Sequence, residues 1–333
     1  MTSTEQKGIV RWGLVGAAGI AGRSFLPGLQ AAGRGRAVVV GSRDAERGAA
    51  FAKEYGVERS VVGYEEVVTS PDVDAVYVAL ANVEHAEWTA RALEAGKPVL
   101  CEKPLVSDAE QAERVVAAAK STAPGLLWEA CQFVYRSQHR RVLDLIADGA
   151  IGAPREVISA FQVEIDRPGD FRMAPVGGGS LADVGCYSLR LGEEILGRAT
   201  GDPLYAAGRM EGGIDVDVAG IVGLDRGRLY LTCGFRRGFD VFARILGQEG
   251  QIHLTSPFHP GPDATLTLLR PRQEAVVEHA AGDDPAYQGV AEHIHGVLLD
   301  GNPPEHLVVD TAVSTARTLD ALRAAVIAHP LPE

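Results

Sequence analysis

The sequence predicts an α/β protein with a doubly wound parallel sheet at its N-terminal end, followed by an α+β domain with a large, open, mostly antiparallel sheet. Up to about residue 130, short apolar runs alternate with helical segments at spacings of roughly 20–30 residues. The apolar runs are hydrophobic throughout, as in parallel strands that are covered on both faces. Beyond residue 150, alternating strand-like runs separated by glycine turns predict the second sheet.

The elements of the first half are read in chain order. Helix predictions rest on apolar spacing and on stops such as the glycine after "DAERGAAFAKEY". We expect strands over residues 9–15, 37–42, 75–80, 98–104 and 126–132, helices over residues 22–32, 44–56, 83–96 and 108–120, and a short helix and turn over residues 65–73.

The pattern changes near residue 130, so we expect a first domain over residues 1–128 and a substrate-binding and oligomerisation domain over residues 129–333. A helix over 140–152 opens the second domain, and a helix from Ser180 to Leu196 interrupts its strands. The expected strands are 155–165, 204–210, 215–224, 227–235, 242–254 and 265–271, followed by helices near 287–300 and 310–327.

Composition excludes several classes of function. A net charge of −12 argues against general nucleic-acid binding, which needs a basic surface. No apolar run approaches the roughly 20 residues that span a membrane, and the N-terminus lacks the pattern of a signal peptide. The four cysteines show no metal-binding spacing, and His293 and His295 are too close in sequence to form a helical metal pair. We expect a cytoplasmic protein without a metal ion, a membrane or nucleic acid as partner.

A glycine-containing turn follows the first expected strand. In "VRWGLVGAAGIAG" the pattern is Gly16-x-Ala18-x-x-Ala21, a variant of the dinucleotide fingerprint with alanine at the second and third glycine positions. Backbone N–H groups and the start of the helix can still hold a pyrophosphate. Glycine-containing turns between strand and helix are common, but this one begins a series of βα units. It therefore predicts a nucleotide-binding domain of the Rossmann type.

The end of the second strand bears on the choice of cofactor. Enzymes that use NAD tend to place an acidic residue here for the ribose 2′-hydroxyl. This chain has Ser42 and Arg43, with Arg47 further on, and these groups suit a 2′-phosphate. We therefore favour NADP(H) over NAD(H). The alternative is a solvated turn in which Asp44 caps the next helix.

The stretch "KPVLCEKP" contains two Lys-Pro pairs. Lys103 and Pro104 end a parallel strand, at the edge of the sheet where open α/β proteins bind ligands. An ammonium group there can polarise a carbonyl. A charged surface turn is the alternative for Lys103. Lys97 begins the same strand at the opposite edge, and we expect a structural role for it.

A second glycine-rich loop lies in "GGGSLADVGCYSLRLGEEILG". Ser180 is a candidate helix cap, and Asp183 and Tyr187 are four residues apart, which puts both on one helix face. A phenol beside an ammonium is a usable proton donor. The alternative is a capping carboxylate with a partly buried tyrosine.

Two further residues are candidates. His85 follows the strand "AVYVAL", where contact with a cofactor and helix capping are both open. Arg172, in "GDFRM" just before the glycine loop, is a candidate for contact with a pyrophosphate.

With "GAAGIAG", "AVYVALANVEHAEW", "AGKPVLCEKPL" and "GGGSLADVGCY" in this order, the chain resembles the Gfo/Idh/MocA oxidoreductase family. The resemblance implies a Rossmann domain joined to a domain with a large open sheet, often used for oligomerisation. Homodimers or homotetramers are therefore expected. Many members have histidine where this chain has Tyr187, so a histidine-based proton relay is not expected.

The same resemblance implies roles for individual residues. Lys103 would contact both cofactor and substrate and, with Tyr187 and Asp183, would be catalytic, while Arg172 would join them in binding the substrate. The residues expected to line the cofactor are Gly16, Ala17, Ala18, Ile20, Ala21, Ser42, Arg43, Arg47, Leu80, Asn82, His85, Glu102 and Lys103.

Within the family, Tyr187 together with "SQHRR", "GDFR" and "RVLDLIADGAIG" is most similar to the 3-ketoreductases of dTDP-linked hexoses in deoxysugar and antibiotic biosynthesis. This implies hydride transfer from NADPH to C3 of a dTDP-linked keto-sugar, with Tyr187 as proton donor and Lys103 orienting the carbonyl. One alternative is a dehydrogenase of a free sugar, an inositol or a dihydrodiol. Another is a catalytically silent NADP sensor, which we would expect to lack Lys103 or Tyr187.

Overall fold

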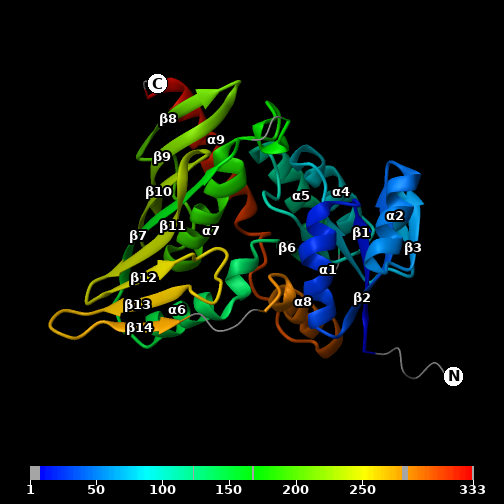
Figure 1. The fold of residues 1–333 in the computed structure, drawn as a ribbon, viewed down its shortest axis with the longest axis horizontal. Helices are drawn as coiled ribbons and strands as arrows, with labels where there is room; N and C mark the ends of the chain where they lie inside the picture. The colour runs from blue at the N-terminus through cyan, green and yellow to red at the C-terminus, as the bar shows by residue number, and fades with distance from the viewer. Residues whose placement is uncertain (1–7, 123, 167–168, 280–283, 332–333) are drawn as a thin grey trace. The chain divides into compact units, whose positions relative to one another are not determined.

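The computed structural model describes residues 8–122, 124–166, 169–279 and 284–331, and the chain forms two compact units (Figure 1). The first unit comprises residues 1–106, 110–132 and 284–312, and the second comprises 107–109, 133–283 and 313–333. The change of pattern near residue 130 predicts residues 284–312 in the second domain, but in the structure this return segment belongs to the first unit.

The first unit is built on a six-stranded parallel sheet in the order β3-β2-β1-β4-β5-β6. Its strands are β1 (Val10–Val15), β2 (Gly35–Ser42), β3 (Arg59–Val62), β4 (Ala75–Val78), β5 (Val99–Cys101) and β6 (Leu127–Glu129). All four residues of β4 are buried, as expected of a strand covered on both faces. From β1 the chain continues to β2 and β3 on one side of β1, and then returns to β4 on the other side of β1, so the strand order reverses there. Ligands of open α/β sheets bind at such a switch point, beyond the carboxyl ends of the strands.

The helices of this sheet follow the predicted βα pattern: α1 (Leu26–Ala31), α2 (Ala45–Tyr55), α3 (Glu65–Thr69), α4 (Asn82–Glu94) and α5 (Ala109–Ser121). A π-helical turn, η1 (Ala21–Phe25), precedes α1. The ends of α2 have clear causes. The Asp44 carboxylate accepts a hydrogen bond from the Arg47 N–H at 2.8 Å, and Gly56 ends the helix with a φ of +71°.

The return segment carries α8 (Gln288–His295) and η5 (Gly296–Asp300). Helix α8 packs on α1. A methyl group on Gly28 would come within 2.7 Å of the Tyr287 backbone, so a glycine permits this close approach. The Trp12 indole N–H donates to His295 Nε2 at 3.1 Å. These contacts explain why the return segment belongs to the first unit. No local sequence pattern predicts them.

The second unit contains an eight-stranded sheet in the order β14-β13-β12-β11-β7-β10-β9-β8. All its pairings are antiparallel except that of β7 with β10, which is parallel. The strands are β7 (Pro154–Glu164), β8 (Tyr205–Glu211), β9 (Ile214–Leu224), β10 (Gly227–Gly234), β11 (Arg236–Gly247), β12 (Gln251–Thr255), β13 (Thr265–Leu269) and β14 (Val276–His279). The predicted fold class is confirmed for both sheets.

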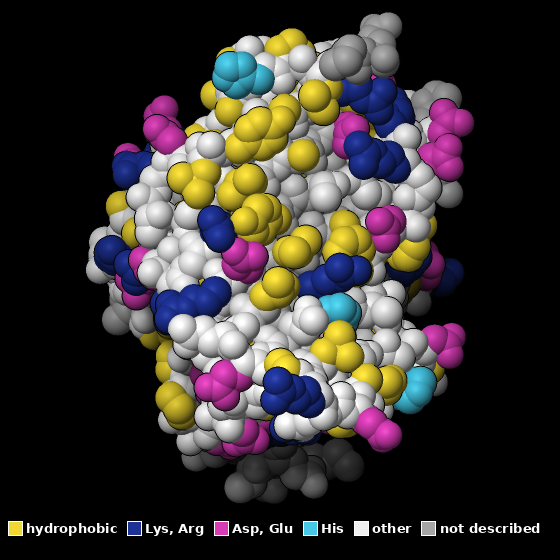
Figure 2. All heavy atoms as spheres, turned by 90° about the vertical axis from the view of Figure 1, so that its left-hand side faces the viewer, with side chains coloured by type: hydrophobic (Ala, Val, Ile, Leu, Met, Phe, Trp, Pro, Cys, Tyr) yellow, Lys and Arg dark blue, Asp and Glu magenta, His cyan; other side chains and the backbone are white. Residues whose placement is uncertain are grey.

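The helices of the second unit include α6 (Ser137–Ala147), the π-helical turn η4 (Leu181–Gly185), α7 (Cys186–Leu196) and α9 (Ala312–Ala328). Helix α7 packs on β7 and β10, where the Ser159 and Ser188 hydroxyls are 2.9 Å apart. The opposite face of the sheet carries half-buried apolar side chains, among them Ile158, Ile221 and Tyr230. Figure 2, viewed from the left-hand side of Figure 1, shows hydrophobic side chains gathered over the middle of this face. No helix in the described part of the chain is long and apolar enough to cross a membrane.

Candidate active site

The turn after β1 has the geometry of a nucleotide-binding loop. Gly16 has a φ of +112°, and a Cβ there would lie 2.3 Å from the Ala79 carbonyl oxygen, so only glycine fits. The turn ends at η1, whose first residue is Ala21. The loop therefore follows β1 at the switch point of the sheet, where its backbone N–H groups can face a pyrophosphate.

The side chains after β2 gather beside this loop. The Arg47 guanidinium donates to the Ala17 carbonyl oxygen at 2.8 Å, which joins α2 to the glycine turn. Ser42 is buried, and its hydroxyl accepts the Asp44 N–H at 3.2 Å. The Arg43 side chain is 73% exposed and lies 3.3 Å from Glu84. Asp44 caps α2, as the alternative interpretation of this turn expected, and the guanidinium of Arg43 is largely exposed to solvent.

His85, in the first turn of α4, ties two loops together. Its Nδ1 lies 2.8 Å from the Pro104 carbonyl oxygen and its Nε2 lies 3.1 Å from that of Leu80. Burial lowers the pKa of His85, and the nearby charge of Lys103 lowers it further. The ring links the loop after β4, where Asn82 begins the helix, to the loop after β5. The cofactor contact predicted for His85 stays a prediction.

Lys103 follows β5 and is joined to Pro104 by a cis peptide bond. The preceding Glu102 carboxylate is buried. Its Oε1 accepts hydrogen bonds from the Tyr77 phenol, at 2.5 Å, and from the Tyr287 phenol. Its Oε2 accepts the Lys103 backbone N–H at 3.3 Å. Burial raises the pKa of Glu102, while the bonds from Tyr287 and Tyr77 and the charge of Lys103 act against that rise.

Sequence reasoning missed both tyrosines. Tyr77 is the polar member of the strand "AVYVAL", a weak signal that a buried hydroxyl needs a partner. Tyr287 gave no signal, because it lies 185 residues from Glu102 in the chain.

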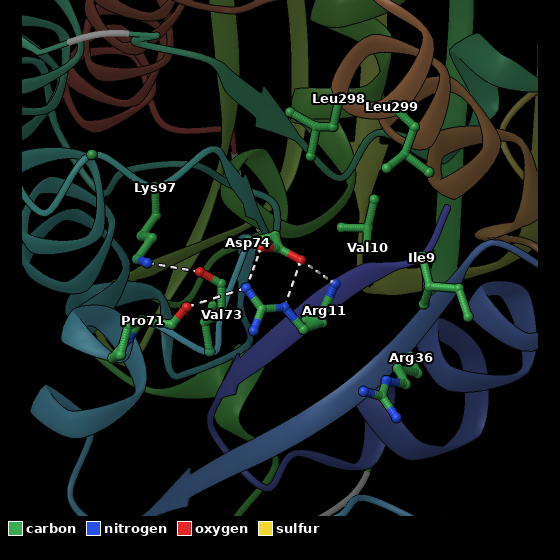
Figure 3. Close-up of a pocket in the computed structure, with 11 residues that line it drawn as sticks. Ile9, Val10, Arg11, Arg36, Pro71, Val73, Asp74, Lys97, Leu298 and Leu299 are labelled. Atoms are coloured by element: carbon green, nitrogen blue, oxygen red, sulfur yellow. Dashed lines mark hydrogen bonds and ion pairs between the residues drawn. The ribbon is translucent and has the colours of Figure 1, made fainter. Parts of the chain in front are cut away.

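Lys97 has the structural role predicted for it. Its ammonium group donates to the carbonyl oxygens of Ser70, at 2.9 Å, and Val73, at 2.7 Å, near the amino ends of the strands. Burial lowers the pKa of Lys97. A pocket of about 840 Å³ lies at this edge, lined by Ile9, Val10, Arg11, Arg36, Pro71, Val73, Asp74, Gly96, Lys97, Leu298 and Leu299 (Figure 3).

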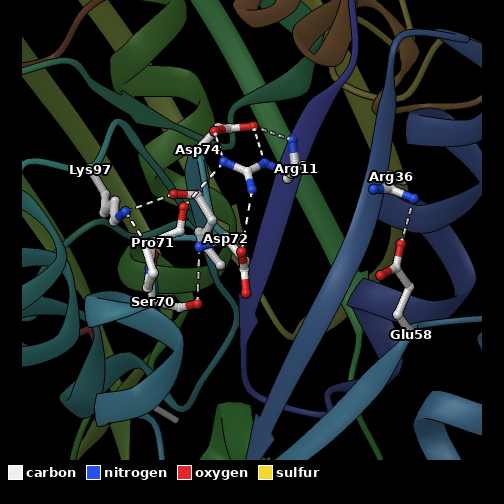
Figure 4. Close-up of polar contacts among 9 residues, drawn as sticks. Arg11, Arg36, Glu58, Ser70, Pro71, Asp72, Asp74 and Lys97 are labelled. Atoms are coloured by element: carbon white, nitrogen blue, oxygen red, sulfur yellow. Dashed lines mark hydrogen bonds and ion pairs between the residues drawn. The ribbon is translucent and has the colours of Figure 1, made fainter. Parts of the chain in front are cut away.

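The cations of this pocket have partners within the protein. Arg11 binds the Asp74 carboxylate with two guanidinium nitrogens at 2.7 and 3.0 Å, and Arg36 lies 2.8 Å from Glu58 (Figure 4). The pocket is at the opposite edge of the sheet from the glycine loop, and its charges are already compensated. We therefore assign it no part in cofactor binding.

The candidate residues of the second unit follow its glycine-rich loop. Gly179 has a φ of +110°, and a Cβ there would lie 2.4 Å from an Asp215 carboxylate oxygen. The fully buried Asp215 accepts the Ser180 hydroxyl at 2.9 Å and the Leu181 N–H at 2.6 Å. Arg323 of α9 approaches the other oxygen at 3.4 Å. The capping bond predicted for Ser180 is wrong, because its hydroxyl binds Asp215 instead.

This loop leads into η4 and α7, which carry Asp183 and Tyr187. The Tyr187 side chain is buried among the rings of Phe133, Phe161, Phe258 and His259, at centroid distances of 5.4–6.2 Å. The structure thus places Tyr187 in an aromatic pocket of the second unit.

Arg172 lies beside Asp183, with 4.0 Å between a guanidinium nitrogen and a carboxylate oxygen. Two other nitrogens of Arg172 bind the Asp170 carboxylate at 2.8 and 2.7 Å, and this bonding raises the pKa of Arg172. Arg172 and Asp183, both predicted to contact the substrate, are therefore neighbours in the structure. Their contacts with a substrate stay predictions.

Comparison with known proteins agrees with this arrangement. Residues 10–126 match the model of an oxidoreductase family with an NAD-binding Rossmann fold, and residues 139–253 match the Gfo/Idh/MocA C-terminal domain. A dTDP-3,4-didehydro-2,6-dideoxy-α-D-glucose 3-reductase of Actinomadura kijaniata is 35% identical, over 94% of this chain and 95% of that protein. A D-xylose 1-dehydrogenase (NADP⁺) of Haloferax volcanii is 30% identical, over 93% and 95%.

A solved structure of a related enzyme has a similar fold. A 3-ketoreductase from Actinomadura kijaniata, in complex with NADP and TDP-benzene, superimposes with a TM-score of 0.84 and 31% identity, covering 97% of this chain and 99% of that one.

Proposed function

The chain belongs to the Gfo/Idh/MocA family of oxidoreductases, and we propose that it is an NADPH-dependent 3-ketoreductase of a dTDP-linked keto-deoxysugar. The similarity to the 3-reductase of Actinomadura kijaniata over nearly the whole of both chains carries this proposal. The presence of both Lys103 and Tyr187 supports an active enzyme rather than a silent NADP sensor.

The residues present fit a dinucleotide. Gly16 lets the turn after β1 pack against the Ala79 carbonyl oxygen, and η1 begins beyond this turn, where backbone N–H groups can hold a pyrophosphate. The exposed guanidinium of Arg43 suits a 2′-phosphate. The lining that we propose also includes Ala17, Ala18, Ile20, Ala21, Ser42, Arg47, Leu80, Asn82, His85, Glu102 and Lys103. NADP in the related 3-ketoreductase structure supports NADP(H) over NAD(H).

Arg43 offers a test of this choice. Because its charge would pair with the 2′-phosphate that NADH lacks, Arg43→Ala should raise the KM for NADPH about tenfold. The KM for NADH should change far less. Steady-state kinetics with both cofactors measures the difference, and equal effects would count against recognition of the 2′-phosphate by Arg43.

The chemistry proposed for the protein divides among three side chains. Bound NADPH supplies the hydride. Lys103 would orient and polarise the C3 carbonyl through its ammonium group. Tyr187 would give its phenol proton to the oxygen of that carbonyl. Asp183 would accept a hydrogen bond from a sugar hydroxyl, and Arg172 beside it would contact the pyrophosphate of the substrate.

A dehydrogenase of a free sugar, an inositol or a dihydrodiol is the second candidate. The similarity to the D-xylose dehydrogenase of Haloferax volcanii supports it. A thermal-shift screen with NADPH present separates the two candidates. We expect dTDP-sugars to stabilise the protein more than free sugars or inositols, and a preference for free polyols would overturn the proposal of a nucleotide-sugar substrate.

We also propose a homodimer or homotetramer. The face of the eight-stranded sheet opposite α7, with Ile158, Ile221 and Tyr230 half-buried on it, supports an interface there. Sedimentation velocity measures the assembly directly, and a monomer at micromolar concentration would contradict this proposal. A cytoplasmic location stays a prediction.

A further inference from the structure

We propose that Tyr287, together with Tyr77, is a positioning residue for the reaction. The two phenols hold the Glu102 carboxylate, and this carboxylate fixes the backbone that carries Lys103. The inference rests on the proposed function only in so far as Lys103 acts on the substrate. The inference adds Tyr77 and Tyr287 to the residues of the proposed active site. Both lie outside the glycine-rich loops and outside the Glu102-Lys103-Pro104 stretch.

The geometry concentrates three donors on one buried carboxylate. Oε1 of Glu102 accepts both phenol hydroxyls, and Oε2 accepts the Lys103 N–H at 3.3 Å. Tyr77 is fully buried, and Tyr287 and Glu102 are 2% and 8% exposed. A carboxylate removed from water needs such donors to remain ionised, and hydrogen bonds to charged groups are the stronger kind.

The segment around Lys103 is anchored on its other side as well. The Leu105 N–H donates to Glu129 Oε1 at 2.8 Å, and the Pro104 carbonyl oxygen lies 2.8 Å from His85 Nδ1. The backbone that follows Lys103 is therefore tied to β6 and α4. Glu102 is the anchor that precedes the lysine, and it depends on the two tyrosines.

The tyrosines also connect Lys103 to the nucleotide loop. The Phe25 ring, at the end of η1, stacks on Tyr77 with centroids 3.9 Å apart and an angle of 14° between planes. It meets Tyr287 edge-on at 5.9 Å. The turn that begins beside Gly16 therefore packs, through Phe25, on the same two tyrosines that bind Glu102. The nucleotide loop and Lys103 are thus positioned by the same pair of side chains.

The network has a consequence for pH dependence. Burial raises the pKa of Glu102, and the phenols oppose this, so loss of either phenol should raise it further. The titratable groups around Glu102 belong to several elements: Tyr77 of β4, His85 of α4, Cys101 of β5, Lys103, Glu129 of β6 and Tyr287 of the return segment. Protonated Glu102 would lose its electrostatic attraction to the Lys103 charge, and the hydrogen bond that it accepts from the following N–H would weaken.

The first test uses turnover by the full-length protein across a range of pH. Tyr287→Phe should lower kcat about tenfold or more, because a hydrogen bond to a charged group is lost, with the KM for NADPH changed less than about twofold. The acidic limb of the kcat profile should move to higher pH by about 1. Tyr77→Phe should act in the same direction, and the double variant should approach Glu102→Gln.

A merely structural role for Tyr287 would not move the pH profile. Tyr205→Phe is the control, because it removes a tyrosine hydroxyl from β8 of the second unit, where Tyr205 is 53% exposed. It should leave the profile unchanged. Profiles of Tyr287→Phe that superimpose on those of the unmodified protein would overturn the proposal.

The second test needs no substrate and so separates this proposal from the function on which it rests. Infrared difference spectroscopy, with Glu102→Gln as the blank, follows protonation of the Glu102 carboxyl directly. The midpoint should rise by about 1 in Tyr287→Phe. An unmoved midpoint would refute the role of Tyr287. A moved midpoint in a protein that reduces no nucleotide sugar would refute the proposed function and leave the positioning of Lys103 standing.

Discussion

The loop that carries Lys103 and the loop that leads to Asp183 and Tyr187 are stabilised in similar ways by different groups. Each contacts one buried carboxylate, Glu102 in the first unit and Asp215 in the second. Glu102 collects two neutral phenols, whereas Asp215 collects a hydroxyl, a backbone N–H and a guanidinium.

The comparison shows how the two loops that the sequence motifs mark are stabilised by the rest of the chain. In both regions most donors come from segments remote in sequence, such as the return segment and α9. In the first unit, however, the carboxylate directly precedes the proposed catalytic lysine. Protonation of Glu102 can therefore change the activity of Lys103. Asp215, by contrast, stabilises the glycine turn at Gly179.

The largest effect should come from Lys103→Ala. Removing the ammonium that polarises the carbonyl should reduce kcat by about 10³-fold or more, while the protein still binds NADPH. Turnover assays, together with fluorescence titration of NADPH, measure both quantities. Unchanged turnover would remove Lys103 from the mechanism and would leave the first region with a structural role only.

Tyr187→Phe tests the second region. Loss of the phenol proton should lower kcat by about 10²–10⁴-fold, the usual contribution of general acid catalysis. The aromatic packing with Phe133 and Phe258 is kept, so stability should change little. A near-normal rate would transfer the proton donation to water or to another group.

Asp215→Ala should show its effect in stability before activity. It leaves the Ser180 hydroxyl and the Leu181 N–H without their acceptor, at a cost of about 1–3 kcal/mol for each buried group. Chemical denaturation measures the loss, and Asp215→Asn, which keeps one acceptor oxygen, should lose less. Equal stability of Asp215→Ala and the unmodified protein would show that the glycine loop does not depend on this carboxylate.

The return segment of the first unit should lose stability at low pH. Burial, with the charge of Arg34 nearby, lowers the pKa of His295 to about 4, below its ordinary value of 6.5. The unfolded chain therefore binds a proton first, so this stability is present above pH 6.5 and is lost as pH falls toward 4. The slope should be about 1.4 kcal/mol per pH unit. Denaturation across this range measures the slope, and His295→Gln should reduce it, while His85 and His293, whose pKa burial also lowers, keep their share.

The sequence predicted the helices and strands that depend on short-range patterns of residues. The run "AVYVAL", without a charged residue, predicted a buried parallel strand, and the alternating runs predicted the second sheet; the structure confirms both. The helix over 44–56 was predicted from Asp44 and Gly56, and both ends have the expected caps. These features follow from local propensity and periodicity.

Long-range partners could not be predicted in this way. Tyr287, Asp215 and Arg323 act across distant parts of the chain, and nothing near them in the sequence marks their partners. The return segment was assigned to the second domain for the same reason, since its packing on α1 depends on Gly28 and on the bond between Trp12 and His295.

The most direct test of the central claim is the fate of the hydride. The protein is incubated with a dTDP-linked 3-keto-deoxysugar and NADPH deuterated at C4 of the nicotinamide, and the product is analysed by NMR and mass spectrometry. We predict one deuterium at C3 of the nucleotide sugar, and transfer slowed by about 10³-fold or more with Lys103→Ala. Deuterium transfer only to a free sugar or polyol, with no reduction of the nucleotide sugar, would contradict the account.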